Sequence, residues 1–330
     1  MTAPEFSEIE LALTSTALAG DAGGLYRIAT GLMDDGVPFD SILFDYFLAA
    51  ERAVGIRWAQ GDYLVAEEHA VTAAIETVIS LLAGMFDQPT DAPHVVVTTA
   101  EGDDHSLPAR VAAAHLLYLG YRTTFLGANI PGEDLSDYLR SDPPAVLVLS
   151  GTMTTHLLGA RNVVEAAHES GIAVVVGGNA FGPDGIWAST VGADAWVSSL
   201  QEVSSVVEEW AYGSPPAFKT TPDISPDLNG LVAVRTALLA EAEDELASEL
   251  DDVVPARLKE ELALLQAAVE GSLLADDDRI VAEMLRWQRS SLDAYGHDGL
   301  SVARALQTSL DASSPAGSLV LQRALASLDS

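Results

Sequence analysis

The sequence predicts an α/β domain with a doubly covered parallel sheet between two all-helical domains. In the N-terminal block, apolar residues recur at helical spacing. In the central block, short Val-rich runs alternate with helical patterns, which is typical of strands buried on both faces of a parallel sheet. After a proline-rich stretch, helical spacing returns. We therefore expect domains at 1–90, 91–213 and 231–330, with a linker at 214–230.

The N-terminal block should form four helices packed as a small bundle. Clusters of Gly and Asp separate the periodic segments and predict short connections, so consecutive helices should be neighbours. The four segments are Ile9–Leu18, Leu25–Met33, Phe39–Val54 and Val65–Met85.

The central block should form a five-stranded Rossmann-like sheet. Helical patterns such as Ala109–Leu119 and Leu157–His168 connect the apolar runs. Ligands of such sheets bind beyond the carboxyl ends of the strands, so we look for a site in the loops that follow them. The expected strands are His94–Ala100, Arg122–Leu126, Ala145–Gly151, Ala173–Val176 and Ala195–Ser199.

The C-terminal block follows a linker, Gly213–Gly230, that contains four prolines. Beyond it, about 100 residues carry helical periodicity and no strand signal. We expect a separate all-helical domain.

The charge balance excludes several classes of function. The 330 residues include 16 Lys and Arg against 49 Asp and Glu, a net charge of −33, so the surface repels nucleic acids and anionic membranes.

No apolar run approaches the ~18 residues of a membrane span, and the acidic start MTAPEFSEIE is unlike a signal peptide. Without cysteine, disulfides, thiolate metal sites and thioether-attached cofactors are excluded. We expect a cytoplasmic protein.

The loop after the first strand carries the strongest single motif, Gly102-Asp103-Asp104-His105. A His at a strand's carboxyl end, with an Asp two residues before it, suits a metal ligand and the carboxylate that orients it. A solvated loop His explains this motif alone equally well. A dinucleotide site does not explain it, because no G-x-G-x-x-G follows any strand.

Two further strand ends strengthen the functional interpretation. Ser150 and Thr152 follow the third strand, and the paired glycines Gly177 and Gly178 follow the fourth. Paired glycines allow a flat ligand to approach the backbone, and hydroxyl groups can satisfy its polar atoms. Each pair is weak evidence alone, because strand ends are often rich in Ser and Gly.

Together these motifs resemble the cobalamin-binding domain of the methionine synthase and corrinoid-protein superfamily. The family pattern Asp-x-His-x-x-Gly, Ser-x-Leu/Thr and Gly-Gly stands here as Asp103-x-His105, Ser150-x-Thr152 and Gly177-Gly178, and Leu126–Leu135 resembles the family's connection after the second strand. The resemblance implies that His105 is the lower axial ligand of cobalt. It also implies that Ser150, Thr152, Gly177 and Gly178 line the slot for the displaced dimethylbenzimidazole tail. Pro108 stands where the family has the last Gly of the first motif.

The helical block carries a second motif, Trp58 followed after nine residues by Glu68-His69. A core Trp beside an exposed acidic turn would explain it, but the spacing resembles the helical cap of light-sensing cobalamin regulators of the CarH type. That resemblance implies that Trp58, Val65, Glu68 and His69 cover the upper face of adenosylcobalamin. The chain departs from those regulators in two ways: it begins in the cap with no helix-turn-helix domain, and Ala59 replaces the His that ligates cobalt after photolysis.

The C-terminal domain contains one cluster of arginine, aromatic and histidine residues. Arg286, Trp287, Tyr295 and His297 could meet the propionates and pyrrole nitrogens of a tetrapyrrole, or form an ordinary helix end. A cobalamin cap and sheet followed by a globin-like helical domain resembles the photocobilins, which implies a biliverdin held non-covalently. A helical domain for signalling or dimerisation would give nearly the same pattern.

We therefore expect a non-enzymatic light sensor in which photolysis of adenosylcobalamin shifts the cap and signals to an effector. Self-association to a dimer or larger oligomer is expected from the related sensors. Two alternatives stay open. The chain is a corrinoid methyl carrier for a methyltransferase, which predicts methylcobalamin and tolerance of Trp58→Ala, or it is an adaptor with a degenerate, empty site.

Overall fold

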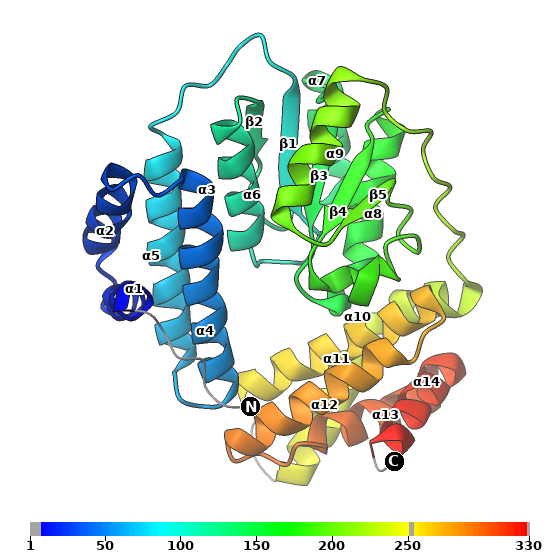
Figure 1. The fold of residues 1–330 in the computed structure, drawn as a ribbon. Coiled ribbons are helices and arrows are strands. Elements are labelled where there is room, and N and C mark those ends of the chain that lie inside the picture. The colour runs from blue at the N-terminus through cyan, green and yellow to red at the C-terminus, as the bar shows by residue number, and fades with distance from the viewer. Residues whose placement is uncertain (1–7, 251–253, 329–330) are drawn as a thin grey trace.

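The computed structural model describes residues 8–250 and 254–328, in which two helical domains flank an α/β domain (Figure 1). The N-terminal helices, called the cap below, lie on one side of the sheet domain. The C-terminal helices lie across the end of both. The cap comprises α1 (Glu8–Leu18), α2 (Ala22–Asp34), α3 (Phe39–Ser41), η1 (Ile42–Phe47), α4 (Leu48–Ala59) and α5 (Val65–Ala83).

The cap helices fall where the periodicity predicts them and share one apolar core. Phe47, Ile75 and Ile79 are fully buried at its centre. Leu107 and Val111 of the following α/β domain belong to the same core, so the cap is packed against that domain.

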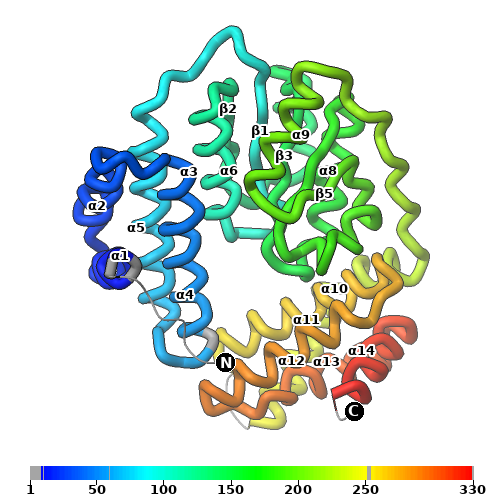
Figure 2. The backbone as a smooth tube through the Cα atoms, viewed as in Figure 1, coloured from blue at the N-terminus to red at the C-terminus, as the bar shows by residue number. Residues whose placement is uncertain are grey.

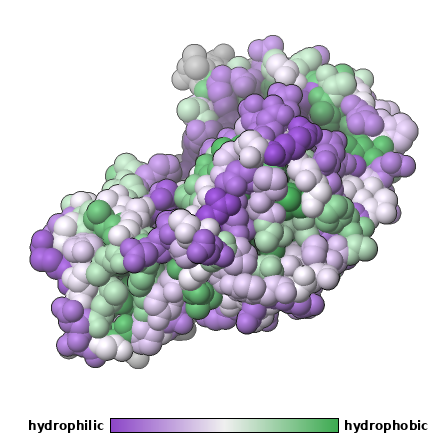
Figure 3. Space-filling view, turned by 90° about the horizontal axis from the view of Figure 1, so that it is seen from above, coloured by the Kyte–Doolittle hydropathy of each residue, from purple (hydrophilic) through white to green (hydrophobic). Residues whose placement is uncertain are grey.

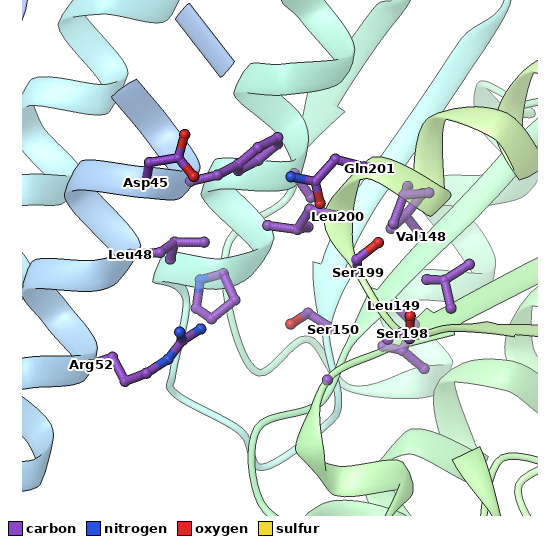
Figure 4. Close-up of a pocket in the computed structure, with 17 residues that line it drawn as sticks. Asp45, Leu48, Arg52, Val148, Leu149, Ser150, Ser198, Ser199, Leu200 and Gln201 are labelled. Atoms are coloured by element: carbon purple, nitrogen blue, oxygen red, sulfur yellow. The ribbon is translucent and has the colours of Figure 1, made fainter. Parts of the chain in front are cut away.

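One feature of the cap is not predicted by the periodicity. α3, η1 and α4 run on from one another, and the middle segment is π-helical, with the amide of Leu48 bonded to the carbonyl of Leu43. A π-helical turn admits one extra residue and changes the direction of the side chains that follow. Phe44 and Asp45 lie in this segment and line a cavity shared with the α/β domain, and the Phe44 ring lies 4.9 Å from that of His115. Figure 4 shows Asp45 on this wall.

The α/β domain contains one parallel sheet with the strand order β2-β1-β3-β4-β5. Val96, Leu147 and Val176 face the core formed with α7 and α8, whereas Val95 and Val175 face the core formed with α6 and α9. This alternation explains why each strand reads as a continuous apolar run. The elements are β1 (His94–Thr99), α6 (Leu107–Tyr118), β2 (Arg122–Phe125), α7 (Gly132–Ser141), β3 (Val146–Ser150), η2 (Thr154–His156), α8 (Leu157–Glu169), β4 (Val174–Gly177), η3 (Asn179–Phe181), η4 (Pro183–Gly185), β5 (Ala195–Val197) and α9 (Leu200–Tyr212).

The register aligns the carboxyl ends of three strands. Thr99 of β1 is level with Ser150 of β3, and Ser150 is level with Gly177 of β4. The three loops that the sequence singles out therefore leave the sheet at one edge.

The chain reaches the third domain through an extended segment, visible as a strap beside the sheet domain in Figure 2. Its backbone amide at Lys219 donates to Asp194 Oδ1 at 3.0 Å, and Phe218 stacks on His168 with ring centroids 4.7 Å apart. Helix resumes at Pro226, inside the stretch expected to be linker, because proline is tolerated in the first turn. The C-terminal helices are α10 (Pro226–Leu250), α11 (Ala256–Ala275), α12 (Arg279–Ala294), α13 (Ser301–Ser313) and α14 (Pro315–Ser327).

The third domain contacts both of the others. Trp187 of the α/β domain donates from Nε1 to Asp277 Oδ2 at 3.0 Å. On the cap side, the Tyr295 hydroxyl lies 3.3 Å from the carbonyl oxygen of Trp58 and 3.4 Å from that of Tyr63. The α4–α5 turn of the cap is thus fixed to the C-terminal helices. A globin-like arrangement of these helices stays a prediction.

The surface seen from above is largely hydrophilic, with apolar residues in separate small patches (Figure 3). Among the helices of the two described ranges, none has the length and apolar character that a membrane crossing needs.

Candidate cofactor site

Asp103 ties together the loops that leave β1 and β3. Its side chain is fully buried; Oδ1 lies 2.7 Å from His105 Nδ1, and Oδ2 accepts from the backbone amide of Thr152 at 2.7 Å. Burial raises the pKa of this carboxyl. The hydrogen bond with His105, the contact with His156 and the Thr152 amide outweigh burial and hold the pKa well below its usual range. Asp103 is therefore an anion fixed beneath His105.

His105 has the geometry of an axial metal ligand. Nδ1 is engaged by Asp103, which leaves Nε2 free for coordination, and the side chain remains 51% exposed. The hydrogen bond to Asp103 raises the pKa of His105 although burial opposes it. An imidazole whose far nitrogen donates to a carboxylate is the usual arrangement of a metal-bound histidine.

His105 faces the cap across a cavity of about 410 Å³, called the upper cavity here. Glu68 and His69 of α5 also line this cavity. His69 Nδ1 lies 2.6 Å from Glu68 Oε2, and Glu68 Oε1 accepts from the Thr72 hydroxyl at 3.0 Å. The pair is therefore held by its own helix while it faces the cavity.

Glu51 and Thr72 belong to this wall but were not predicted. The Thr72 hydroxyl also lies 2.7 Å from Glu51 Oε1, which extends the hydrogen-bonded chain from α5 to α4. The i, i+4 spacing of Glu68 and Thr72 could have indicated half of this arrangement. Glu51 comes from another helix, so only the packing of α4 on α5 reveals it.

Replacement of Glu51 by glutamine is expected to stabilise the apo-protein above neutral pH. Burial, reinforced by the charge of Glu68, raises the pKa of Glu51 from 4.5 to about 7. Because the folded state favours the protonated acid, the native protein loses stability as the pH rises from 4.5 to 7, by roughly 2–3 kcal/mol. Chemical unfolding at pH 5 and pH 8 measures the difference. Parallel pH curves for the native protein and Glu51→Gln would contradict the assignment, and Glu241→Gln on the exposed side of α10 controls for the lost charge.

A second cavity of about 350 Å³, called the slot, opens between the ends of β3 and β4 and the start of α9 (Figure 4). Ser150, Gly177 and Gly178 line it, whereas Thr152 lines the upper cavity. That these residues receive a cofactor's tail stays a prediction. Gly178 has φ +107°, and a Cβ on it would stand 2.2 Å from the carbonyl oxygen of Gly151. Only glycine fits there.

Pro108 lies between the two cavities. It stands in the first turn of α6 and lines both spaces, as does Leu48 of α4. Proline at this position keeps the helix start intact. Pro108, which stands where the resembled pattern has glycine, therefore forms part of the wall that separates the slot from the upper cavity.

Trp58 and Val65 lie away from the upper cavity, and neither lines it. Trp58 is seven residues beyond Glu51 on α4, about 10 Å along the helix. Its ring lies 6.2 Å from that of Trp287, and Val65 is exposed at the start of α5. The side chain of Ala59 lies outside what the structure describes.

The C-terminal candidates separate into two pairs. Trp287 and Tyr295 meet Trp58, whereas the exposed Arg286 and the half-buried His297 make no ring contact with this group. Arg257, which was not predicted, lies over the Tyr295 ring at 3.7 Å and over Trp58 at 5.9 Å. We call Trp58, Arg257, Trp287 and Tyr295 the bridge cluster. It joins the cap to the third domain.

The site as a whole fits a metal that brings most of its own ligands. Within residues 8–250 and 254–328, no group of three or more His, Asp or Glu side chains is arranged to hold a metal ion. His105 offers a single oriented nitrogen, and the slot beside it is lined by Gly177 and Gly178, of which Gly178 has no room for a Cβ. A macrocyclic cobalt cofactor with an extended tail suits this combination.

Comparisons with known proteins agree with that chemistry. Residues 93–202 match the family model of a B12 binding domain, and residues 10–83 match a second B12 binding domain model. Trimethylamine corrinoid protein 1 of Methanosarcina mazei is 26% identical over 190 residues, which cover 55% of this chain and 87% of that protein. Dimethylamine corrinoid protein 3 of Methanosarcina acetivorans is 26% identical over 181 residues, covering 52% of this chain and 83% of that protein. The monomethylamine corrinoid protein of Methanosarcina barkeri has a related fold, with a TM-score of 0.51 at 20% identity over 61% of this chain and 98% of that one.

These comparisons support a cobalamin-binding protein with the α/β fold of the corrinoid proteins. The relatives are corrinoid proteins rather than methyltransferases by name, in agreement with the expectation that the chain is not an enzyme. They favour the corrinoid-protein alternative over light sensing, and none of these three proteins is named as a photoreceptor or a bilin-binding protein.

Proposed function

We propose that this chain, with its two segments of B12-binding type, holds a cobalamin between the cap and the sheet domain. One observation carries the proposal: His105, oriented by the buried Asp103, faces Glu68 and His69 across a single cavity that adjoins a glycine-lined slot. His105 would bind the cobalt through Nε2. Ser150, Gly177 and Gly178 would receive the tail, and Glu68 and His69 would enclose the upper ligand. The cofactor, when bound, supplies a cobalt–carbon bond that light can break.

The residues of the chain have separate parts in this arrangement. Asp103 keeps the Nδ1 proton of His105 in place, so that Nε2 is presented to the metal. Thr152 donates its amide to the same carboxylate and thereby fixes the β3 loop to the β1 loop. Leu48 and the hydrogen-bonded Glu51–Thr72–Glu68 chain form the cap side of the upper cavity.

We further propose that the cofactor is adenosylcobalamin and that its state is reported to the third domain. Glu51 and Glu68, which face the upper cavity, lie on either side of the α4–α5 turn. The same turn carries Trp58 and Tyr63, which the third domain contacts through Tyr295. If the cap can take two positions, a ligand that binds better to one of them increases the fraction of molecules in that position. A change in what the upper cavity encloses would thus change the contacts that the bridge cluster makes.

The remaining parts of this proposal lie beyond the cap. Biliverdin would be held non-covalently near Trp287 and Tyr295, in a globin-like domain, with Arg286 and His297 as further contacts. A downstream effector and self-association would give the output.

The second candidate is a corrinoid methyl carrier that docks onto a methyltransferase, and the methylamine corrinoid relatives favour it. A carrier must open its cap to expose cobalt. In this chain a third domain is fixed to the cap and to the α/β domain at once. That double contact is the observation that favours an enclosed, switched cofactor.

The decisive experiment compares protein loaded in the dark with adenosylcobalamin or with methylcobalamin, each with and without biliverdin. Absorption spectra are recorded before and after green and red light, with size-exclusion chromatography in parallel. A light-induced change of elution with adenosylcobalamin supports the sensor. Unchanged elution, together with methyl transfer from loaded protein to an acceptor by a corrinoid-dependent methyltransferase, overturns the sensor and supports the carrier. Failure to retain any corrinoid overturns both.

A further inference from the structure

Arg52 is a cation that faces a cavity rather than a carboxylate. It lies on α4 and lines the slot together with Asp45 and Leu48, opposite Ser150 and Gly178. Figure 4 shows its guanidinium directed into the space between cap and sheet, with the side-chain amide of Gln201 and the Ser150 hydroxyl facing it from the far wall. Leu48 and Glu51, which lie on the same helix as Arg52, line the upper cavity.

Most of the 16 cationic side chains pair with one of the chain's 49 carboxylates. Among the described residues, the cations without such a pair are Arg52, Arg57, Lys219, Arg286 and Arg289, and of these Arg52 lines the slot. Arg122 pairs with Asp142, Arg304 with Asp298 and Arg323 with Asp278. In the part of the chain that the structure describes, no carboxylate oxygen lies within 4.0 Å of Arg52. Asp45, on the same wall of the slot, is not paired with it.

The proposed ligand of the slot contains one fixed negative charge. The tail of a complete cobalamin is joined to the corrin ring through a phosphodiester, whereas the ring's own side chains are neutral amides. The chain's net charge of −33 opposes the entry of such an anion. A planar guanidinium with several donors is the side chain best suited to hold a phosphate ester.

We propose that Arg52 binds the phosphodiester of the cofactor's tail, so that the cap selects complete corrinoids over those that lack the phosphate. The inference rests on the proposed cobalamin site and assigns Arg52 a part in specificity. The cap thereby contacts the cofactor at two places. Glu68 and His69 face its upper ligand, and Arg52 faces the charged part of its tail.

The test measures dissociation constants by absorption titration for cobinamide, cobinamide phosphate and cobalamin, all in the hydroxo form. The native protein is compared with Arg52→Gln and Arg52→Lys. Arg289→Gln, at an exposed arginine of α12 that lines neither cavity, is the matched control. Thermal unfolding of each apo-protein verifies that the variants fold, and inorganic phosphate is added in one series as a competitor.

We expect Arg52→Gln to weaken the binding of cobalamin and cobinamide phosphate by about tenfold to a hundredfold, and that of cobinamide less than about twofold. Arg52→Lys should fall between, and the loss should shrink as salt is added. An equal loss for all three ligands, or no loss for any, overturns the inference and leaves the proposed function intact. Native protein that binds none of the three overturns the proposed function itself.

Discussion

Replacement of His105 by alanine is expected to lower the affinity for cobalamin by at least about a hundredfold and to change the spectrum of any cofactor still bound. His105 is the one side chain of the upper cavity whose free nitrogen is oriented by a buried carboxylate. Loss of an orienting partner alone typically costs tenfold to a hundredfold in metal affinity, and loss of the ligand costs more. Absorption titration gives both the affinity and the axial ligation.

Three variants make this test specific. Asp103→Asn, which removes the fixed anion and keeps the imidazole, should give the smaller loss of about tenfold to a hundredfold. His105→Gly with added imidazole should recover the native spectrum, because a free imidazole can occupy the vacated space. His297→Gln, in the third domain, should bind like the native protein. An unchanged spectrum for His105→Ala would show that another group ligates cobalt.

Replacement of Gly178 by alanine is expected to have the second large effect, on both stability and tail binding. The residue has φ +107° and ψ 172°, a backbone region that is essentially restricted to glycine and costs an L-residue roughly 1–3 kcal/mol. The new Cβ would also meet the carbonyl oxygen of Gly151 at 2.2 Å. The β4 loop must then move away from β3, which distorts the slot. Urea unfolding measures the first effect and cobalamin titration the second.

Gly171→Ala is the matched control for backbone strain. Gly171 also has a positive φ, +77°, but no heavy atom lies within 4 Å of the place that a methyl group would take, and the residue lies outside both cavities. It should lose some stability and keep the affinity of the native protein for cobalamin. Equal affinities for Gly178→Ala and Gly171→Ala would mean that the slot does not receive the tail.

The sequence predicts the sheet and the residues at its edge because both follow from local rules. Continuous Val-rich runs separated by helical patterns require a parallel sheet, and parallel pairing brings the ends of β1, β3 and β4 to one edge. Asp103, His105, Ser150 and Gly178 could therefore be grouped before their distances were known. The helix α7 was missed because the stretch after β2 was interpreted through its resemblance to a connecting segment.

The residues whose surroundings the sequence does not reveal depend on packing between helices and between domains. Trp58 shares a spacing with Glu68 and His69, but spacing along the chain does not reveal that the helix carries Trp58 past the cavity to Trp287. Glu51 joins Thr72 only because α4 packs on α5. Arg257 reaches Tyr295 and Trp58 across a domain boundary, for which one sequence holds no signal.

The strap that leads from α9 to α10 limits how far the third domain can move if its contacts with the cap at the bridge cluster break. Lys219 and Phe218 anchor the strap to the α/β domain, so the third domain is tethered close to its docking surfaces. Re-docking is then a unimolecular event with an effective local concentration in the millimolar range, independent of dilution. A brief separation of the third domain would therefore be reversed quickly. The tether thus makes the return of the third domain to its docking surfaces independent of the protein concentration.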